Sequence, residues 1–182
     1  MQIKDIVRKI STFFLANLLI LLHLSWRIIF HQPIDLLNII MAVFLWLIIL
    51  NPRQSYNLAI IYILLVCELF YTSPFGLEGL SQILALLLAN WLLLNVFTNR
   101  SLIIVFFTGL ITMAAYRIVF ILLLYLNSLI QNHPISISAT LINIFLNETL
   151  VTTITLSLFY LISSIFVKRL RPEYILETSR II

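Results

Sequence analysis

The stretch SLIIVFFTGLITMAAYRIVFILLLYL, residues 101–126, decides the class of this protein. Arg117 is its one charged side chain, and nearly all the other residues are apolar. A helix needs about 20 predominantly apolar residues to cross the hydrocarbon core of a bilayer. The whole chain is similarly apolar, because 62% of its 182 residues are hydrophobic and only 10% are charged. Soluble domains carry about 25% charged residues, so the composition excludes an ordinary soluble domain and indicates an integral membrane protein.

The same reasoning, applied outward from this stretch, predicts an all-α integral membrane protein with six transmembrane helices in one bundle. The whole chain, 1–182, forms a single domain. Proline-containing and polar clusters separate the apolar runs, since proline lacks the amide hydrogen that a helix interior needs. The second and third runs are short, so a five-span alternative, in which the second run is re-entrant, stays open. The predicted spans are residues 10–30, 34–50, 56–73, 77–98, 101–126 and 141–167.

Basic residues predict the orientation, because short cytoplasmic loops are enriched in lysine and arginine. Nine of the eleven basic residues fall on one side of the predicted spans, and only Arg27 and Arg117 fall elsewhere. We therefore place both termini in the cytoplasm. The net charge of +4 then reflects membrane topology, and we expect no nucleic-acid partner. The nine residues are Lys4, Arg8, Lys9, Arg53, Arg100, Lys168, Arg169, Arg171 and Arg180.

The sequence lacks the usual signatures of enzymes and metal proteins. Cys67 is the single cysteine, and His23, His31 and His133 are scattered. A zinc or cluster site needs several such ligands at short spacing. No glycine-rich phosphate loop and no nucleophile elbow are present. We expect a protein that is not an enzyme and that needs no metal or cofactor.

Three charged residues lie inside predicted spans, where a charge costs at least about 2.5–3.5 kcal/mol. They are Glu68, Arg117 and Glu148. Arg117 and Glu148 lie at depths that differ by about 3 Å at the helical rise, so we predict an ion pair between them. The alternatives are an outward-facing polar cavity lined by all three residues, or protonated carboxylates without partners. Glu78 opens the fourth span, where we expect it to cap the helix.

A local motif adds a family resemblance. In residues 68–80, ELFYTSPFGLEGL, Glu68 closes a span, Gly76 follows eight residues later in a Pro-Phe-Gly-Leu turn, and Leu80 comes next in the motif. This pattern resembles the MreD family of bacterial rod shape-determining membrane proteins. The opening of the second span at 33–37, the length and the six-span layout are also similar. The chain departs from the family in having Glu where Asp is more usual, and in lacking glycines before that acid.

The resemblance implies a fold similar to the substrate-binding subunits of energy-coupling-factor transporters. It implies a non-enzymatic, multi-pass subunit of the cell-elongation (rod) complex in the bacterial cytoplasmic (inner) membrane, which scaffolds or regulates peptidoglycan synthesis and cell shape. The implied partners are an MreC-like single-span protein, a RodA-like glycosyltransferase, a penicillin-binding transpeptidase and, indirectly, MreB filaments. The candidate motif or partner-binding residues are Glu68, Pro74, Phe75, Gly76 and Leu80.

Two other interpretations stay open. A substrate-binding subunit of an energy-coupling-factor type vitamin or metal transporter has the same length and span count. Its usual mark is an Ala-x-x-x-Ala pair in the first span, but here Ala16 stands alone and the pair Ala85/Ala89 lies in the fourth. The third interpretation is an unrelated helical membrane protein or enzyme. A scaffold predicts a groove for a partner helix, whereas a transporter subunit predicts a closed outer pocket.

Overall fold

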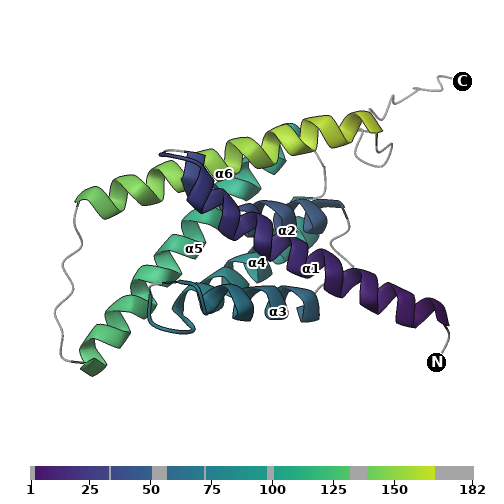
Figure 1. Ribbon diagram of the computed structural model, residues 1–182. Helices are drawn as coiled ribbons and strands as arrows, with labels where there is room; N and C mark the ends of the chain where they lie inside the picture. The colour runs from purple at the N-terminus through teal and green to yellow at the C-terminus, as the bar shows by residue number, and fades with distance from the viewer. Residues whose placement is uncertain are drawn as a thin grey trace, which may run out of the picture.

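The structure, a computed structural model, is all-helical over the residues that it describes (Figure 1). These residues are 3–32, 34–50, 57–71, 73–97, 101–131 and 139–166, without the side chains of 3–10 and 57–58. No strand occurs among them. The elements are α1 (Ile3–Ile29), the 3₁₀ helix η1 (Ile34–Leu36), α2 (Ile39–Leu50), α3 (Asn57–Glu68), α4 (Leu77–Asn95), α5 (Leu102–Gln131) and α6 (Ala139–Phe166).

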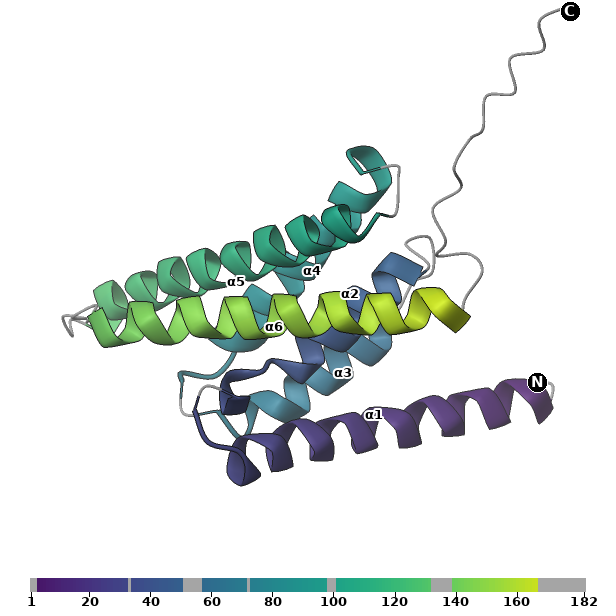
Figure 2. The same ribbon diagram turned by 90° about the horizontal axis from the view of Figure 1, so that it is seen from above.

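Successive helices run in alternating directions across the molecule. Figures 1 and 2 both place the start of α1 and the end of α6 on the right-hand side. The end of α1, the connection between α3 and α4, and the start of α6 lie on the opposite side. The chain therefore crosses the bundle repeatedly, and the α3–α4 connection lies at the end of the bundle away from the start of α1.

Four helices are long and apolar enough to cross a membrane: residues 11–29 of α1, and the whole of α4, α5 and α6. The chain is thus a multi-pass membrane protein, as the composition predicts. The helices α2 and α3 have 12 residues each. At the helical rise each spans about 18 Å, which is less than the roughly 30 Å of a hydrocarbon core.

At three places the bounds of the helices differ from those of the predicted spans. In the second span the regular helix begins only at Ile39, because Asn38 caps it from a non-helical position. The third span ends at Glu68 and not at residue 73, since the chain turns there to meet the start of α4. The fifth extends to Gln131, because the Ser128 hydroxyl bonds to the carbonyl of Tyr125 and the polar residues stay helical.

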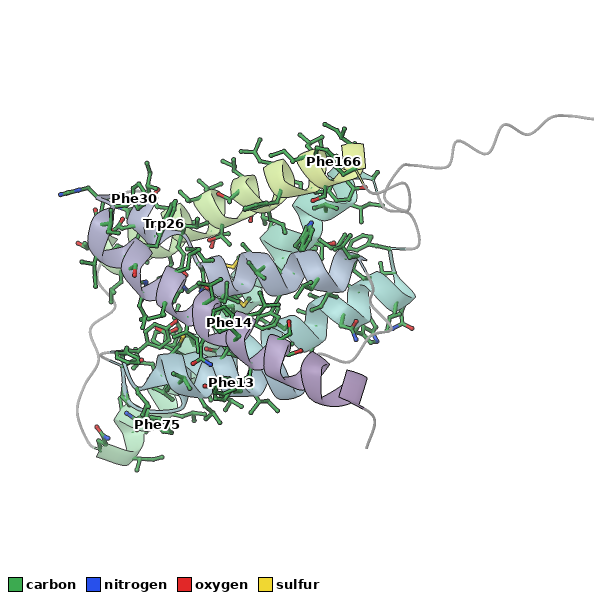
Figure 3. All side chains as sticks on the ribbon, turned by 45° about the vertical axis from the view of Figure 1, so that its right-hand side comes forward. Phe13, Phe14, Trp26, Phe30, Phe75 and Phe166 are labelled. Atoms are coloured by element: carbon green, nitrogen blue, oxygen red, sulfur yellow. The ribbon has the colours of Figure 1, made fainter. Side chains whose placement is uncertain are left out.

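The long helices bury small and polar residues and expose large apolar ones. On α5 the buried residues include Thr108, Thr112 and Arg117, while Ile118 is 59% exposed. Large apolar side chains cover the outside, as Figure 3 shows for Phe13 and Phe14 on α1. In a bilayer the lipid tails are as apolar as leucine, so small and polar residues drive helix packing. This distribution fits a surface that faces lipid.

The helix α2 forms the centre of the bundle, where it contacts α1, α4 and α6. It is apolar all round, as expected for a helix buried on every face. The helices α5 and α6 also pack closely, since a Cβ added at Gly109 would lie only 3.1 Å from Leu156 and 3.3 Å from Thr153. The buried residues of α2 are Ile39, Ile40, Met41, Ala42, Phe44, Leu45, Ile48 and Ile49.

Most of the residues that carry the orientation argument lie outside the described part of the chain. This holds for Arg53, Arg100 and the basic residues beyond position 166, and for the side chains of Lys4, Arg8 and Lys9. Pro33, just before the predicted second span, and residues 132–138 of the predicted outer loop at 127–140 are outside it as well. The orientation therefore stays a prediction.

Candidate functional site

The Glu68 carboxylate caps the start of α4. Its Oε1 accepts hydrogen bonds from the backbone N–H groups of Gly76, at 2.8 Å, and Glu78, at 3.2 Å. Its Oε2 accepts one from the N–H of Gly79 at 2.6 Å. The first N–H groups of a helix have no partner inside the helix, and the helix dipole favours a negative charge there. One carboxylate, only 3% exposed, thus satisfies three backbone donors at the start of the helix.

Two glycines make this cap possible. Gly76 has φ = 92°, a left-handed conformation that glycine adopts without steric cost. It stands at the N-cap position of α4, where it supplies no side-chain cap. At Gly79 a Cβ atom would lie 3.0 Å from Glu68 Oε2, in the place that the carboxylate needs. The spacing of Glu68, Gly76 and Gly79 in the sequence therefore allows one carboxylate to cap the helix that follows the turn.

This arrangement changes two of the sequence-based interpretations. We placed Glu68 inside the predicted span 56–73, but its carboxylate bonds directly to the hairpin backbone because α3 ends at this residue. We also expected Glu78 to cap α4. Glu78 does lie in the first turn, but Glu68 supplies the cap, and the Glu78 side chain bonds elsewhere.

The residues of the family-like motif divide into an inner and an outer set. Glu68 and Gly79 are buried and hold the hairpin together. Phe75 is 66% exposed and Leu80 is 46% exposed, and Figure 3 shows Phe75 on the outside of the bundle. Pro74, also exposed, precedes them. The hairpin therefore presents apolar side chains on a backbone that an internal carboxylate holds in place.

Arg117 and Glu148 pair inside the bundle. The Arg117 Nη2 donates to Glu148 Oε2, joining α5 to α6. A second carboxylate is close by, since Glu78 Oε2 on α4 lies 3.9 Å from Arg117 Nη1. The same Glu78 oxygen accepts the hydroxyl of Tyr116. The structure thus contains the ion pair expected from the sequence, and it adds Glu78 and Tyr116 to it.

Aromatic rings surround the Arg117 guanidinium. Its Cζ lies 4.3 Å from the ring centre of Phe145 and 4.4 Å from that of Tyr116. Phe120 is next, at 5.6 Å. A guanidinium is weakly hydrated and stacks favourably on such rings. The charge that the sequence places in an apolar span is therefore held by two carboxylates and three ring faces.

Asn38 connects this charged cluster to the central helix. Its Nδ2 lies 3.4 Å from Glu148 Oε1, and its backbone N–H donates to the Thr152 hydroxyl at 3.1 Å. Its Oδ1 accepts the N–H of Met41 at 3.1 Å, which caps the start of α2. Asn38 thus fastens the beginning of α2 to two turns of α6.

Glu78 joins the cap and the charged cluster. Its backbone N–H bonds to Glu68, whereas its side chain contacts Tyr116 and lies near Arg117. A continuous polar path therefore runs from the end of α3, through the first turn of α4 and the middle of α5, to α6 and α2. Asn38 and Tyr116 were missed in the sequence analysis. Their signals were an asparagine just before an apolar run, which is an N-cap pattern, and a tyrosine beside the arginine.

A cavity of about 330 Å³ lies beside this cluster, between α1, the α3–α4 hairpin and the helices α4, α5 and α6. Its charged lining residues are Arg27, Glu78 and Arg117. We considered a cavity lined by Glu68, Arg117 and Glu148, which is wrong for the two glutamates. The Glu68 carboxylate bonds to the backbone at the start of α4. Glu148 is 1% exposed and pairs with Arg117, so its carboxylate does not line the cavity.

Tyr71 forms part of the cavity wall near α1. Its hydroxyl lies 3.1 Å from His23 Nε2, and the Arg27 guanidinium lies over its ring at 5.3 Å. Arg27 is exposed, so it is accessible both from outside the bundle and from the cavity.

No group of three or more His, Cys, Asp or Glu side chains that could hold a metal ion occurs in the described ranges. Comparisons of the chain with models of protein families, with curated proteins and with solved structures give no match.

Proposed function

We propose that this protein is an MreD-like subunit of the bacterial cell-elongation complex. In this role it is non-enzymatic, lies in the cytoplasmic membrane and holds an MreC-like single-span protein beside a RodA-like glycosyltransferase and a penicillin-binding transpeptidase. The observation that carries the proposal is the Glu68 cap. The residues of the motif that resembles the family are one physical unit, in which Glu68, Gly76 and Gly79 depend on one another.

The proposal includes six membrane crossings. Four helices meet the length requirement, and α2 and α3 run in opposite directions between them (Figures 1 and 2). Two short helices that cross inside a bundle need not match the bilayer, because neighbouring helices cover them. An even number of crossings also agrees with the start of α1 and the end of α6 lying on one side of the molecule.

We place the partner-binding surface on the outer set of the motif. Phe75 and Leu80 are exposed, and Phe70, 61% exposed, lies on the same hairpin. An amphipathic or apolar partner helix binds through a few large side chains that fit a groove, and exposed aromatic residues are frequent anchors. Because the Glu68 cap holds the hairpin, these side chains are presented without an ordering cost.

The test is copurification with an MreC-like single-span protein from the same organism. We expect the wild-type chain to retain that protein through detergent extraction, and Phe75→Ser and Leu80→Ser to reduce the retained amount about tenfold, the effect of losing roughly 1.4 kcal/mol. Ile162→Ser is the matched control, since Ile162 is 56% exposed on α6 and should leave retention unchanged. Failure of the wild-type chain to retain the MreC-like protein overturns the proposal.

The cavity favours one other candidate, a substrate-binding subunit of an energy-coupling-factor type transporter. Its volume of about 330 Å³ is within the range of small-molecule pockets, roughly 300–1,000 Å³. A ligand that binds only the folded state raises the unfolding temperature. A thermal-shift panel of vitamins and divalent metal ions distinguishes the two functions, and an absence of any shift removes the transporter candidate.

A further inference from the structure

We propose that the cavity between α1, the α3–α4 hairpin, α5 and α6 binds a zwitterionic group, in which a primary ammonium and a phosphate or carboxylate stand close together. The inference rests on the charged residues, the polar lining and the apolar walls of that cavity. It is independent of the MreC-like partner proposed above.

The first argument is charge balance. Arg117 faces two carboxylates, Glu148 and Glu78, so this part of the site carries one excess negative charge. Arg27 is the further cation in the cavity wall, where it lies over the ring of Tyr71. No salt bridge between Arg27 and Glu78 is formed among the described residues. The cavity is thus neutral in total but has a negative and a positive part, which matches a zwitterion better than a simple anion or cation.

The second argument is the polar lining on the hairpin side. Ser73, in the hairpin, lines the cavity together with Arg27. Guanidinium and hydroxyl groups are suitable donors to a phosphate or carboxylate oxygen.

These observations assign a position to each end of the ligand. The oxyanion lies near Arg27 and Ser73, at the end of α1 and in the hairpin. The ammonium lies near the Glu78 carboxylate, which has Tyr116 and Arg117 as its neighbours. A primary ammonium donates hydrogen bonds to a carboxylate, whereas a quaternary ammonium has no N–H to donate.

The remaining wall suits an apolar body. Aromatic side chains line it, from Phe70 and Tyr71 in the hairpin region to Phe120 on α5 and Phe145 on α6. Phe70 is 61% exposed and connects the cavity to the apolar outer surface. The same chemistry occurs in the headgroup of phosphatidylethanolamine and in water-soluble phosphoethanolamine, so the experiment has to distinguish the two sources.

The test measures lipid retention and unfolding temperature on the purified, delipidated full chain in detergent. Phosphatidylethanolamine, phosphatidylcholine, phosphatidylglycerol and free phosphoethanolamine are added in separate arms. We expect phosphatidylethanolamine to be retained in native mass spectra and to raise the unfolding temperature. The choline lipid, without N–H donors, and the glycerol lipid, without a cation, should do so at least about tenfold more weakly. A shift with free phosphoethanolamine equal to that with phosphatidylethanolamine identifies a water-soluble source.

Three variants localise the site. Arg27→Gln and Glu78→Gln should each weaken phosphatidylethanolamine retention about tenfold. Arg27 is exposed, so its replacement keeps the test valid if Glu78→Gln fails to fold. Arg8→Gln, the same substitution at the far end of α1, about 28 Å away at the helical rise, should leave retention unchanged. Equal retention of all three lipids by the wild-type chain, or unchanged retention in Arg27→Gln, overturns the inference.

Discussion

Glu68 and Gly79 fit each other closely: the Gly79 N–H donates to Glu68 Oε2 at 2.6 Å, and a Cβ at position 79 would lie 3.0 Å from that same oxygen. The acid that closes α3 is therefore a structural group that shapes the hairpin. Its buried charge is stabilised by three backbone donors at the positive end of α4. Four predictions test this fit and the polar cluster beyond it.

Glu68→Gln should destabilise the protein by about 2–3 kcal/mol, because the amide keeps one acceptor oxygen and leaves backbone N–H groups unpaired in a buried place. Thermal unfolding in detergent micelles measures the change. Glu68→Asp, shorter by one methylene, should retain part of the stability. A Glu68→Gln variant as stable as the wild type contradicts the capping role.

Gly79→Ala should be destabilising because its methyl group displaces the Glu68 carboxylate. Once that side chain is truncated, the methyl group should cost less. The double variant Glu68→Ala/Gly79→Ala is therefore expected to show a coupling of about 1 kcal/mol, within the range for residues in contact. Gly109→Ala is the control. Gly109 packs against Leu156 in another interface, so its effect should add to that of Glu68→Ala. If the changes in unfolding free energy add in both double variants, Glu68 and Gly79 do not contact each other as described.

Gly76→Ala isolates the cost of backbone conformation. No atom lies within 4 Å of a Cβ at this position, so only the positive φ should penalise alanine, by about 1–2 kcal/mol. Gly76→Asn should recover part of this loss, since asparagine tolerates the left-handed region. Equal unfolding free energies for the alanine and asparagine variants would show that the conformation is not what limits this position.

Arg117→Leu should cost about 3–5 kcal/mol, because it leaves Glu148 charged and buried without its cation. The double variant Arg117→Leu/Glu148→Leu should be more stable than the single one. Glu78 has the Tyr116 hydroxyl as a further partner, so it should remain in place in both. Chemical unfolding in mixed micelles compares the two, and identical stabilities would show that the two residues are not coupled.

The sequence predicts the class of fold well, and it predicts the ion pair, because both depend on simple quantities. Apolar length identifies the four long helices, and helical rise alone places Arg117 and Glu148 at similar depth. The Glu68 cap was not predicted, although Glu68, Gly76 and Glu78 were singled out. The carboxylate reaches the amides only because α3 ends at Glu68 and the chain reverses, and a span boundary is not visible in a continuous apolar run. The charged cavity was also misjudged, since whether a glutamate faces a helix terminus or a cavity depends on packing in three dimensions.

The shortness of α2 has a consequence for how this protein is made. The helix has only 12 residues, fewer than the about 17–25 apolar residues of a usual membrane span, so it depends on its neighbours for burial. The partners that bury α2 include α4 and α6, and Asn38, which caps α2, contacts Glu148 and Thr152 on α6. These two residues follow Asn38 by more than a hundred positions, so the contacts that bury α2 can form only after the C-terminal helices have been synthesised.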